Sequence, residues 1–546
     1  MKLSHPIQFL TFLLSVWASV LTPVHADEEW VYVLSPGDSL WNISHRYLKK
    51  GSYWKQLQQL NNVEDPYHMP PGSRIRIPLE WVVIEPSAAT LEAVRGDVVL
   101  IRADGQQESS SLTGKLAKLG DRLETGKDAG VLIRFADDSL VSLKEQSTLW
   151  FDHLTAYSTS GMVDTRLRLS RGRADTKASK AAGAGSRFEI KTPSAISAVR
   201  GTEFRTAYEN SAEVAGVEVL EGRVAVAGER AQRLVRAGFG TRVELGEKPI
   251  KPVPLLKAPV FLPLPDKIET LNWKLEWVPD SKAVGYRVEL AQDAEFSITL
   301  WQQQILGFRV NLPDVADGHY YVRVRAIDHR GIEGLTGIAE LLLDARPQPP
   351  LPVSPRASSV IYGAAPELSW TASSDAENYR VELSRHDDFR SIIVQQETGK
   401  TRFQLPESVD YGHYYWRVFS LANGEAGPVY VQPGFTLKPV PATPVPQMAE
   451  DETEVELKWQ LPESGQNFHY QIATDSDFSE LINDESQASN AITIPRPEGN
   501  PLYFRVRTVE ADGYAGPWGA TQTIPAVVGD GWIYMLSTIL FGVLLL

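Results

Sequence analysis

Apolar and polar residues alternate with a period of two along much of the chain. The alternation is clear at residues 97–102, 131–135 and 140–143, and it returns at 286–290 and 320–324. A period of two places one face of a strand against a core and the other face in solvent, so these runs indicate half-buried strands. We therefore predict a mainly β, multidomain protein, because 546 residues are too many for a single core.

A helical period interrupts this pattern near the N-terminus. An apolar strand is expected at 30–34, and a Ser-Pro-Gly-Asp-Ser turn follows it. Leu40, Ile43 and Tyr47 then recur at the spacing of one helix face. Asp38 precedes them and is placed to cap that helix.

The next residues complete a small module. A second amphipathic pattern at 53–60 ends at Asn61 and Asn62, and a Pro-Pro-Gly-Ser turn leads into a strand at 74–78. We therefore expect a βααβ module over residues 30–80.

This module resembles the LysM family. The run 32–44, Tyr-Val-Leu-Ser-Pro-Gly-Asp-Ser-Leu-Trp-Asn-Ile-Ser, is similar to the opening motif of that family. Trp54, Leu57 and Asn61 are similar to its second helix, and residues 71–78 to its closing turn and strand. The resemblance implies binding of polymers that contain N-acetylglucosamine, such as peptidoglycan and chitin, in a shallow groove between two loops.

The resemblance also implies which residues form the groove. Backbone groups in a Gly/Pro turn can hydrogen-bond acetamido groups, while small apolar side chains cover the sugar faces. Met69 stands where the family usually has Ile, and the turn and helix cap are a second use of Gly37 and Asp38. The implied glycan-binding residues are Gly37, Asp38, Ser39 and Leu40 in one wall and Met69, Pro70 and Pro71 in the other.

Residues 94–245 are expected to form a β domain that resembles the FecR family. The resemblance rests on residues 192–206 and 217–224, with Gly126 and residues 135–140 fitting the earlier half of the family pattern. FecR domains are periplasmic and best known for relaying an outer-membrane signal to a cytoplasmic sigma factor. That role needs a transmembrane helix and a cytoplasmic N-terminal region. In this chain we expect a signal peptide and the LysM-like module at the N-terminus instead. We therefore carry over only the fold and a protein- or glycan-binding role.

Two features of this domain could be functional, but a structural interpretation is favoured for both. Arg200-Gly201-Thr202 could belong to an active site, but we expect a strand–turn element in which Gly201 allows close backbone approach and Arg200 is paired. The basic run 166–177 alternates with leucines. A solvated strand face is therefore favoured there over an anion site.

The C-terminal half contains an internal repeat. A Trp lies 19 residues before a Phe in each of three copies, and a strand-like run such as Gly-His-Tyr-Tyr-Val-Arg-Val follows. Copies of about 90 residues with several short antiparallel strands have the size of β-sandwiches and resemble fibronectin type III modules. We expect the aromatic residues to form cores, although sugar-stacking platforms are an alternative. The copies cover 264–345, 360–438 and 450–525, with Trp277, Tyr286 and Phe296 in the first, Trp370, Tyr379 and Phe389 in the second, and Trp459, Tyr470 and Phe478 in the third.

Proline-rich segments separate these parts. They lie at 248–265, 347–352 and 439–446, and a shorter link lies between Pro78 and Pro86. Such segments favour extended conformations, so we expect stiff linkers rather than strands.

Composition narrows the chemistry. The net charge of -14 argues against general nucleic-acid binding, and ten scattered histidines show no metal-ligand spacing. With no cysteine, the chain has no thiol chemistry. Residues 120–127 imitate a P-loop, but five residues separate the glycines and Asp128 stands where Ser or Thr is required. We expect no enzyme activity, catalytic residue, metal or cofactor.

The two ends suggest export. Residues 1–26 have a basic start, an apolar run and a Val-His-Ala site before Asp27, which is the layout of a cleaved signal peptide. Residues 530–546 form an apolar tail that is short for a bilayer span, so tail anchor, interfacial segment and buried element stay open. We place the protein in the periplasm or cell envelope, with membrane contact left open.

These features together predict a non-catalytic, peptidoglycan-binding cell-envelope scaffold. The LysM-like module anchors it, while the FecR-like domain and the sandwich repeats bind an envelope protein partner. The alternative is a periplasmic signalling or regulatory component that acts through the FecR-like domain.

Overall fold

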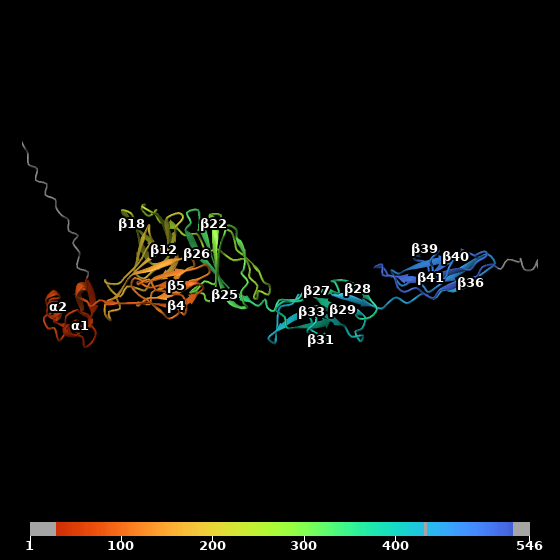
Figure 1. The fold of residues 1–546 in the computed structure, drawn as a ribbon, viewed down its shortest axis with the longest axis horizontal. Helices are drawn as coiled ribbons and strands as arrows, with labels where there is room; N and C mark the ends of the chain where they lie inside the picture. The colour runs from red at the N-terminus through yellow and green to blue at the C-terminus, as the bar shows by residue number, and fades with distance from the viewer. Residues whose placement is uncertain (1–28, 431–433, 528–546) are drawn as a thin grey trace, which may run out of the picture. The chain divides into compact units, whose positions relative to one another are not determined.

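The computed structural model describes residues 29–430 and 434–527 and confirms a mainly β, multidomain fold (Figure 1). It divides between Ala345 and Arg346 into two compact units. The first holds the N-terminal module, a closed β-barrel and the first sandwich repeat, and the second holds the other two repeats. No helix within the described ranges is long and apolar enough to cross a bilayer. The expected signal peptide and apolar tail lie outside the described residues.

The N-terminal module has the predicted strand–helix–helix–strand order. Its two strands pair antiparallel from Glu29↔Pro78 to Val33↔Arg74. Leu40, Ile43 and Tyr47 are buried, as their helical spacing predicted. The elements are β1 (Glu29–Val33), α1 (Leu40–Tyr47), the 3-10 turn η1 (Gly51–Tyr53), α2 (Trp54–Leu60), β2 (Arg74–Pro78) and the 3-10 turn η2 (Leu79–Trp81).

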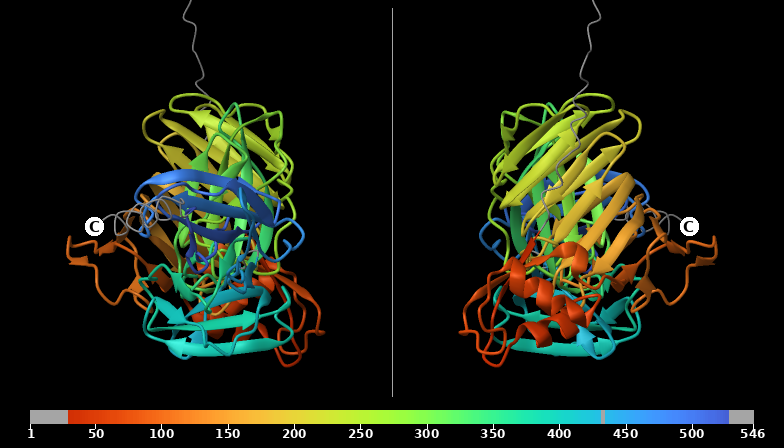
Figure 2. Two further views of the ribbon diagram at one scale, coloured as in Figure 1. Left: turned by 90° about the vertical axis from the view of Figure 1, so that its right-hand side faces the viewer. Right: turned by 90° about the vertical axis from the view of Figure 1, so that its left-hand side faces the viewer.

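The module packs against the barrel that follows it. Met162 of the barrel is fully buried in the core of the module, and Tyr157 and Ala184 pack beside it. Ser158 of the barrel domain also donates to the carbonyl of Arg46 in α1 at 3.2 Å; Figure 1 shows the module beside the end of the barrel, and Figure 2 views that end along the long axis. The two parts therefore share apolar surface, and removing the module would expose part of the barrel.

The barrel is built from eighteen strands in one closed arrangement. The strands are β3 (Glu85–Pro86), β4 (Ala89–Arg95), β5 (Val98–Ile101), β6 (Gln107–Glu108), β7 (Leu116–Ala117), β8 (Arg122–Thr125), β9 (Gly130–Arg134), β10 (Leu140–Leu143), β11 (Thr148–Ala156), β12 (Val163–Lys177), β13 (Arg187–Lys191), β14 (Ile196–Val199), β15 (Glu203–Glu209), β16 (Val214–Glu221), β17 (Arg223–Gly228), β18 (Ala231–Arg236), β19 (Phe239–Glu244) and β20 (Val253–Pro254).

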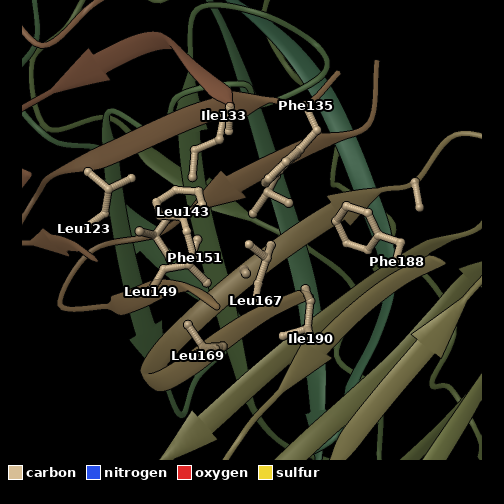
Figure 3. Close-up of a cluster of buried hydrophobic side chains, with 14 of the residues drawn as sticks. Leu123, Ile133, Phe135, Leu143, Leu149, Phe151, Leu167, Leu169, Phe188 and Ile190 are labelled. Atoms are coloured by element: carbon tan, nitrogen blue, oxygen red, sulfur yellow. The ribbon is translucent and has the colours of Figure 1, made fainter. Parts of the chain in front are cut away.

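The inward residues of these strands form a single apolar core. Figure 3 shows Phe135, Phe151 and Phe188 converging with leucines and isoleucines from neighbouring strands. The long strand β12 spans the barrel because it pairs with β11 and β13 through its first half and with β10 and β15 through its second half. The change of strand partners occurs at Gly172, where φ is 91° and a Cβ would clash with Ser147.

Strand β12 corrects one expectation about the basic run. Arg166 and Arg168 do lie on an accessible face, where they pair with Asp164 and Asp152. The far end differs, because Arg173 and Asp175 are covered by the first sandwich repeat and pair with its charged side chains. The alternation of leucines could not show that another domain covers this half of the strand.

The structure corrects two smaller expectations in the same domain. Gly201 has φ of 69° and lies against Lys180, as predicted, but Arg200 is exposed and pairs with no carboxylate of the described residues. Part of the segment expected as a linker is a strand, since Val253–Pro254 pairs with β19. Proline is tolerated there because β20 is only two residues long, so few ladder hydrogen bonds are lost.

Each sandwich repeat pairs a small sheet with a larger one. The first has β21 (Lys274–Glu276) and β24 (Arg309–Asn311) facing β23 (Trp301–Ile305), β22 (Ala283–Ala291), β25 (Gly318–Asp328) and β26 (Glu333–Leu343). The second has β27 (Pro352–Ser354), β29 (Glu367–Trp370) and β32 (Arg402–Gln404) with β28 (Val360–Tyr362), β35 (Phe435–Lys438), β33 (Gly412–Ala422), β30 (Asn378–Ser384), β31 (Ile392–Thr398) and β34 (Glu425–Ala426). The third has β36 (Gln447–Glu450), β37 (Glu454–Lys458) and β40 (Ala491–Pro495) with β39 (Leu481–Gln487), β38 (Asn467–Ala473), β41 (Leu502–Val509) and β42 (Gln522–Ile524).

The repeated aromatic residues are core residues, as predicted. The nine Trp, Tyr and Phe side chains of the pattern are all buried, which leaves them unavailable as sugar-stacking platforms. The Phe of each copy has a left-handed backbone, and an Arg of the long strand lies over its ring. The pairs are Arg323–Phe296, Arg417–Phe389 and Arg505–Phe478, with the guanidinium carbon 4.3, 4.1 and 4.0 Å from the ring centre.

Candidate glycan-binding groove

The two predicted groove walls follow β1 and precede β2, and backbone hydrogen bonds hold them together. Leu34 donates its N–H to the carbonyl of Ser73 at 2.9 Å, and Gly72 donates to the carbonyl of Leu34 at 2.8 Å. These bonds continue the β1–β2 pairing past the last strand residues. The loop at 35–39 and the loop at 69–73 therefore start from neighbouring positions.

Glycine shapes both loops. Gly37 and Gly72 each have φ of 88°, and a Cβ built at either position would meet no atom within 4 Å. The backbone conformation, and not lack of space, therefore requires glycine. The same open space leaves room beside the backbone of each wall.

The helix cap differs from the expectation for Asp38. Ser39 is the N-cap residue of α1, and its hydroxyl accepts the N–H of Asn42 at 3.2 Å. Asp38 closes the preceding turn instead, with its carboxylate accepting from the Ser35 N–H and the Tyr32 hydroxyl, each at 2.7 Å. Burial, together with the hydrogen bond to Asp38, raises the pKa of Tyr32, so its hydroxyl stays a donor at neutral pH.

The seven predicted groove residues differ in accessibility. Gly37, Pro70 and Pro71 are exposed, and Asp38, Ser39 and Met69 are half-buried. The side chain of Leu40 is fully buried in the core of the module, so only its backbone could face a ligand. The accessible surface of the two walls is therefore made of backbone, two proline rings and parts of the Asp38, Ser39 and Met69 side chains.

Two exposed aromatic residues adjoin the predicted walls and were not predicted. Trp41 is 50% exposed on the outer face of α1, and its ring lies 3.9 Å from that of His45. Tyr67 is 66% exposed, two residues before Met69. Aromatic faces pack well on the apolar faces of sugar rings. The helical period contained the signal for Trp41, because it lies outside the Leu40–Ile43–Tyr47 face.

The site contains no catalytic arrangement that we can recognise. In the described parts of the chain, no three His, Asp or Glu side chains are grouped so as to hold a metal ion. The one exposed His–Asp pair near the groove, His68 with Asp65 at 2.9 Å, belongs to a local turn.

Comparison with known families assigns two segments of the chain. Residues 32–78 match the model of the LysM domain, and residues 121–225 match that of the FecR protein family. Both resemblances predicted from the sequence are thereby confirmed. A comparison with curated proteins finds no match to this chain.

Solved structures give weaker likenesses. A putative anti-sigma factor from Parabacteroides distasonis is 15% identical with a TM-score of 0.21; the match covers 24% of this chain and 59% of that protein. The three-domain FN1–FN3 fragment of chicken CNTN1 is 14% identical over 49% of this chain and 97% of its own, with a TM-score of 0.23. The fibronectin(III)-like modules of Clostridium thermocellum CbhA are 14% identical over 32% of this chain and 93% of their own, with a TM-score of 0.22.

Proposed function

We propose that this chain is a non-catalytic cell-envelope protein that binds peptidoglycan through its LysM domain. The observation that carries the proposal is the pair of loops that follow β1 and precede β2, which the LysM match includes completely. The glycan-binding residues we propose are those with accessible groups in these loops, Gly37, Asp38, Ser39, Met69, Pro70 and Pro71, and the backbone of Leu40.

The chemistry of these walls fits N-acetylated sugars. The exposed backbone around Gly37 can hydrogen-bond an acetamido group, and the proline rings and Met69 can cover apolar sugar faces. We add Trp41 and Tyr67 as contact residues, because they are exposed and lie one and two residues in sequence from Leu40 and Met69. One such domain binds weakly, so retention on a polymer would benefit from several copies of the protein.

The rest of the chain serves partner binding in this proposal. The segments matched by family models belong to binding and regulatory families. The aromatic residues at the repeated positions of the sandwich repeats are buried in the cores. We place the protein in the periplasm or cell envelope after signal-peptide cleavage. Contact with a membrane through residues 530–546 belongs to the same proposal and needs its own test.

A second candidate function is periplasmic signalling. The FecR match at residues 121–225 favours it, since it is a regulatory family. Co-purification of the chain with an envelope receptor or kinase, unaffected by excess soluble glycan, would favour this candidate.

The primary proposal is tested by sedimentation of the full chain with purified insoluble peptidoglycan. The soluble tetramer of N-acetylglucosamine should release the bound protein, whereas cellotetraose, which lacks the acetamido groups, should not. Release of soluble wall fragments should stay at the level of a protein-free blank. Equal release by both sugars, or absence of pelleting, would reject the proposed recognition.

A further inference from the structure

The first sandwich repeat docks on the barrel through charged side chains that are buried at the interface. Arg323 of β25 donates to Asp175 of β12 at 2.9 Å, and Arg173 of β12 contacts Glu333 of β26 at 2.5 Å. Arg205 of β15 donates from Nη2 to the carbonyls of Glu333 and Gly334 at 3.0 and 2.8 Å. Barrel and repeat are thus held by one ionic network.

Positive charge exceeds negative charge in this interface network. We define it as six cationic side chains and four carboxylates: Lys144, Arg173, Arg205, Arg287, Arg323 and Arg325 with Asp175, Glu218, Glu289 and Glu333. Burial lowers the pKa of Lys144 and raises the pKa of Glu218. Neutralising that lysine and that glutamate together would leave the same excess of two positive charges. Buried charge without compensation is costly, so the network favours an added anion.

A cavity of about 590 Å³ adjoins this network, and Arg205, Arg323, Arg325 and Asp175 line it. Its accessible apolar walls come from Leu132, Leu140, Leu220, Leu335 and Ile338. Lys177, Glu203 and Glu295 also line it; Lys177 and Glu295 are exposed to solvent that screens their charges, and Glu203 is half-buried. The volume falls in the range of cavities that hold small organic ligands.

Polar atoms of the lining residues lack partners within the described chain. Arg205 and Arg325 are each 2% exposed, yet Nε and Nη1 of Arg205 and Nε of Arg325 have no hydrogen-bond acceptor. The carboxylate of Glu218 pairs with Arg205, but its Oε2 is 3.5 Å from Arg205 Nε and is likewise without a hydrogen-bond donor. The hydroxyl of Thr176 in the same lining also has no partner. Buried guanidinium N–H groups without acceptors are rare, and a ligand oxygen would satisfy them.

We propose that this cavity binds a small organic carboxylate with an apolar body. The carboxylate would accept hydrogen bonds from Arg205 and Arg325, since guanidinium groups match carboxylate geometry. The apolar body would cover the leucine and isoleucine side chains. An inorganic anion would satisfy the charge but leave the apolar walls in water, and a neutral ligand would leave the excess charge in place.

The proposal involves none of the residues of the glycan-binding groove, and its test is independent of peptidoglycan. Octanoate is the probe, 1-octanol the neutral match and acetate the match without an apolar body, each titrated calorimetrically into the full chain. We expect octanoate to bind with a Kd of roughly 0.1–1 mM, as its size allows, and at least tenfold more tightly than either control. Equal affinity for octanoate and octanol, or no binding of octanoate, would overturn the proposal.

Two variants locate the site. Ala294→Trp adds bulk at an exposed lining position without touching the network, so it should weaken octanoate binding at least tenfold, while Ala294→Ser should bind like the unmodified chain. Arg205→Gln should also lose binding, and retained amide protection in β15 would show that its fold persists. Unchanged octanoate affinity in Ala294→Trp would place binding elsewhere and reject the assignment.

Discussion

Arg323 donates hydrogen bonds to two carboxylates in different domains: to Asp175 of the barrel at 2.9 Å and to Glu289 of its own repeat at 2.7 Å. Arg417 holds the same position in the second repeat and pairs with Glu382 of that repeat at 2.7 Å. Both guanidinium groups also lie over the left-handed Phe of their repeat. The Arg–Phe pair therefore occurs in both repeats, but only the Arg of the first repeat also joins its repeat to the barrel.

This difference predicts unequal costs for one substitution at two equivalent positions. Arg323→Met removes one cationic partner from the half-buried Asp175 and the buried Glu289, which then share only Arg325, and we expect a loss of about 3–5 kcal/mol. Arg417→Met removes a more accessible pair within one repeat and should cost about 1–2 kcal/mol. Native-state hydrogen exchange of amides in β25 and β33 measures the two losses separately. Equal losses would show that the contact with the barrel adds nothing.

The sequence predicted the parts of the fold that depend on local pattern. The Leu40–Ile43–Tyr47 spacing identified the buried face of α1, and the Trp-to-Phe spacing identified the repeats. It could not predict that Arg173 is covered, because burial by another domain leaves no trace in strand periodicity. Asp38 and Ser39 illustrate a finer limit, since either residue type can cap a helix and only the backbone geometry decides.

The candidate site likewise has parts that the sequence predicts and parts that depend on tertiary packing. Loop positions such as Gly37 and Pro70 follow from the motif, whereas the burial of the Leu40 side chain depends on packing inside the module. The cavity beside Arg205 could not be predicted at all. Its residues come from two domains, and the sequence does not show that these domains are in contact.

The left-handed backbone at the Phe of each repeat predicts an unusual order of stability among its variants. Phe478 is 8% exposed with φ of 58°, so Phe478→Ala loses buried surface, costing about 3–5 kcal/mol, while keeping a strained backbone. Phe478→Gly loses slightly more surface but relieves roughly 1 kcal/mol of strain. We therefore expect the glycine variant to be at least as stable as the alanine variant, measured by exchange in β38 and β41. A glycine variant that is clearly less stable would contradict the role of this backbone conformation.

Gly172, the single glycine of β12, is predicted to tolerate no side chain. A Cβ there would lie 2.1 Å from the Ser147 Oγ and 2.6 Å from its Cα, in addition to the strain of φ at 91°. We expect Gly172→Ala to lower barrel stability by several kcal/mol, of the order seen for severe overpacking. Gly114→Ala is the control, because φ is 81° but no atom lies within 4 Å, so only about 1–2 kcal/mol of strain applies. Urea unfolding followed by hydrogen exchange of amides in β12 compares them, and equal midpoints would refute the steric argument.

The interface network predicts how barrel and first repeat respond to acid. Burial alone would raise the pKa of Glu289 and Glu333, but the surrounding arginines outweigh it and hold both pKa values below the usual range. Burial is likewise outweighed at Asp175, by Lys144 and Arg325, so its pKa is also lowered. Carboxylates of this kind stabilise the folded state fully above about pH 4.3, their unfolded pKa, and progressively less below it.

Amide protection in β12 and β25 should therefore stay constant from pH 7 to about 5 and fall below about pH 4. Glu218 acts in the opposite sense, because burial raises the pKa of its carboxyl. Glu218→Gln keeps the shape without that titration, so it should leave the acid loss intact. A loss that begins above pH 5 would contradict the lowered pKa values of the other three carboxyls.

The most direct test of peptidoglycan recognition compares two substitutions at Gly37. Both Gly37→Trp and Gly37→Ala carry the strain of φ at 88°, but a Cβ there points into open space, so only tryptophan fills the groove. Binding of the full chain to insoluble peptidoglycan is measured for both at a temperature at which each is folded. The account predicts that Gly37→Trp binds at least tenfold more weakly than Gly37→Ala, a difference of about 1.4 kcal/mol. Equal affinities of the two variants would contradict it.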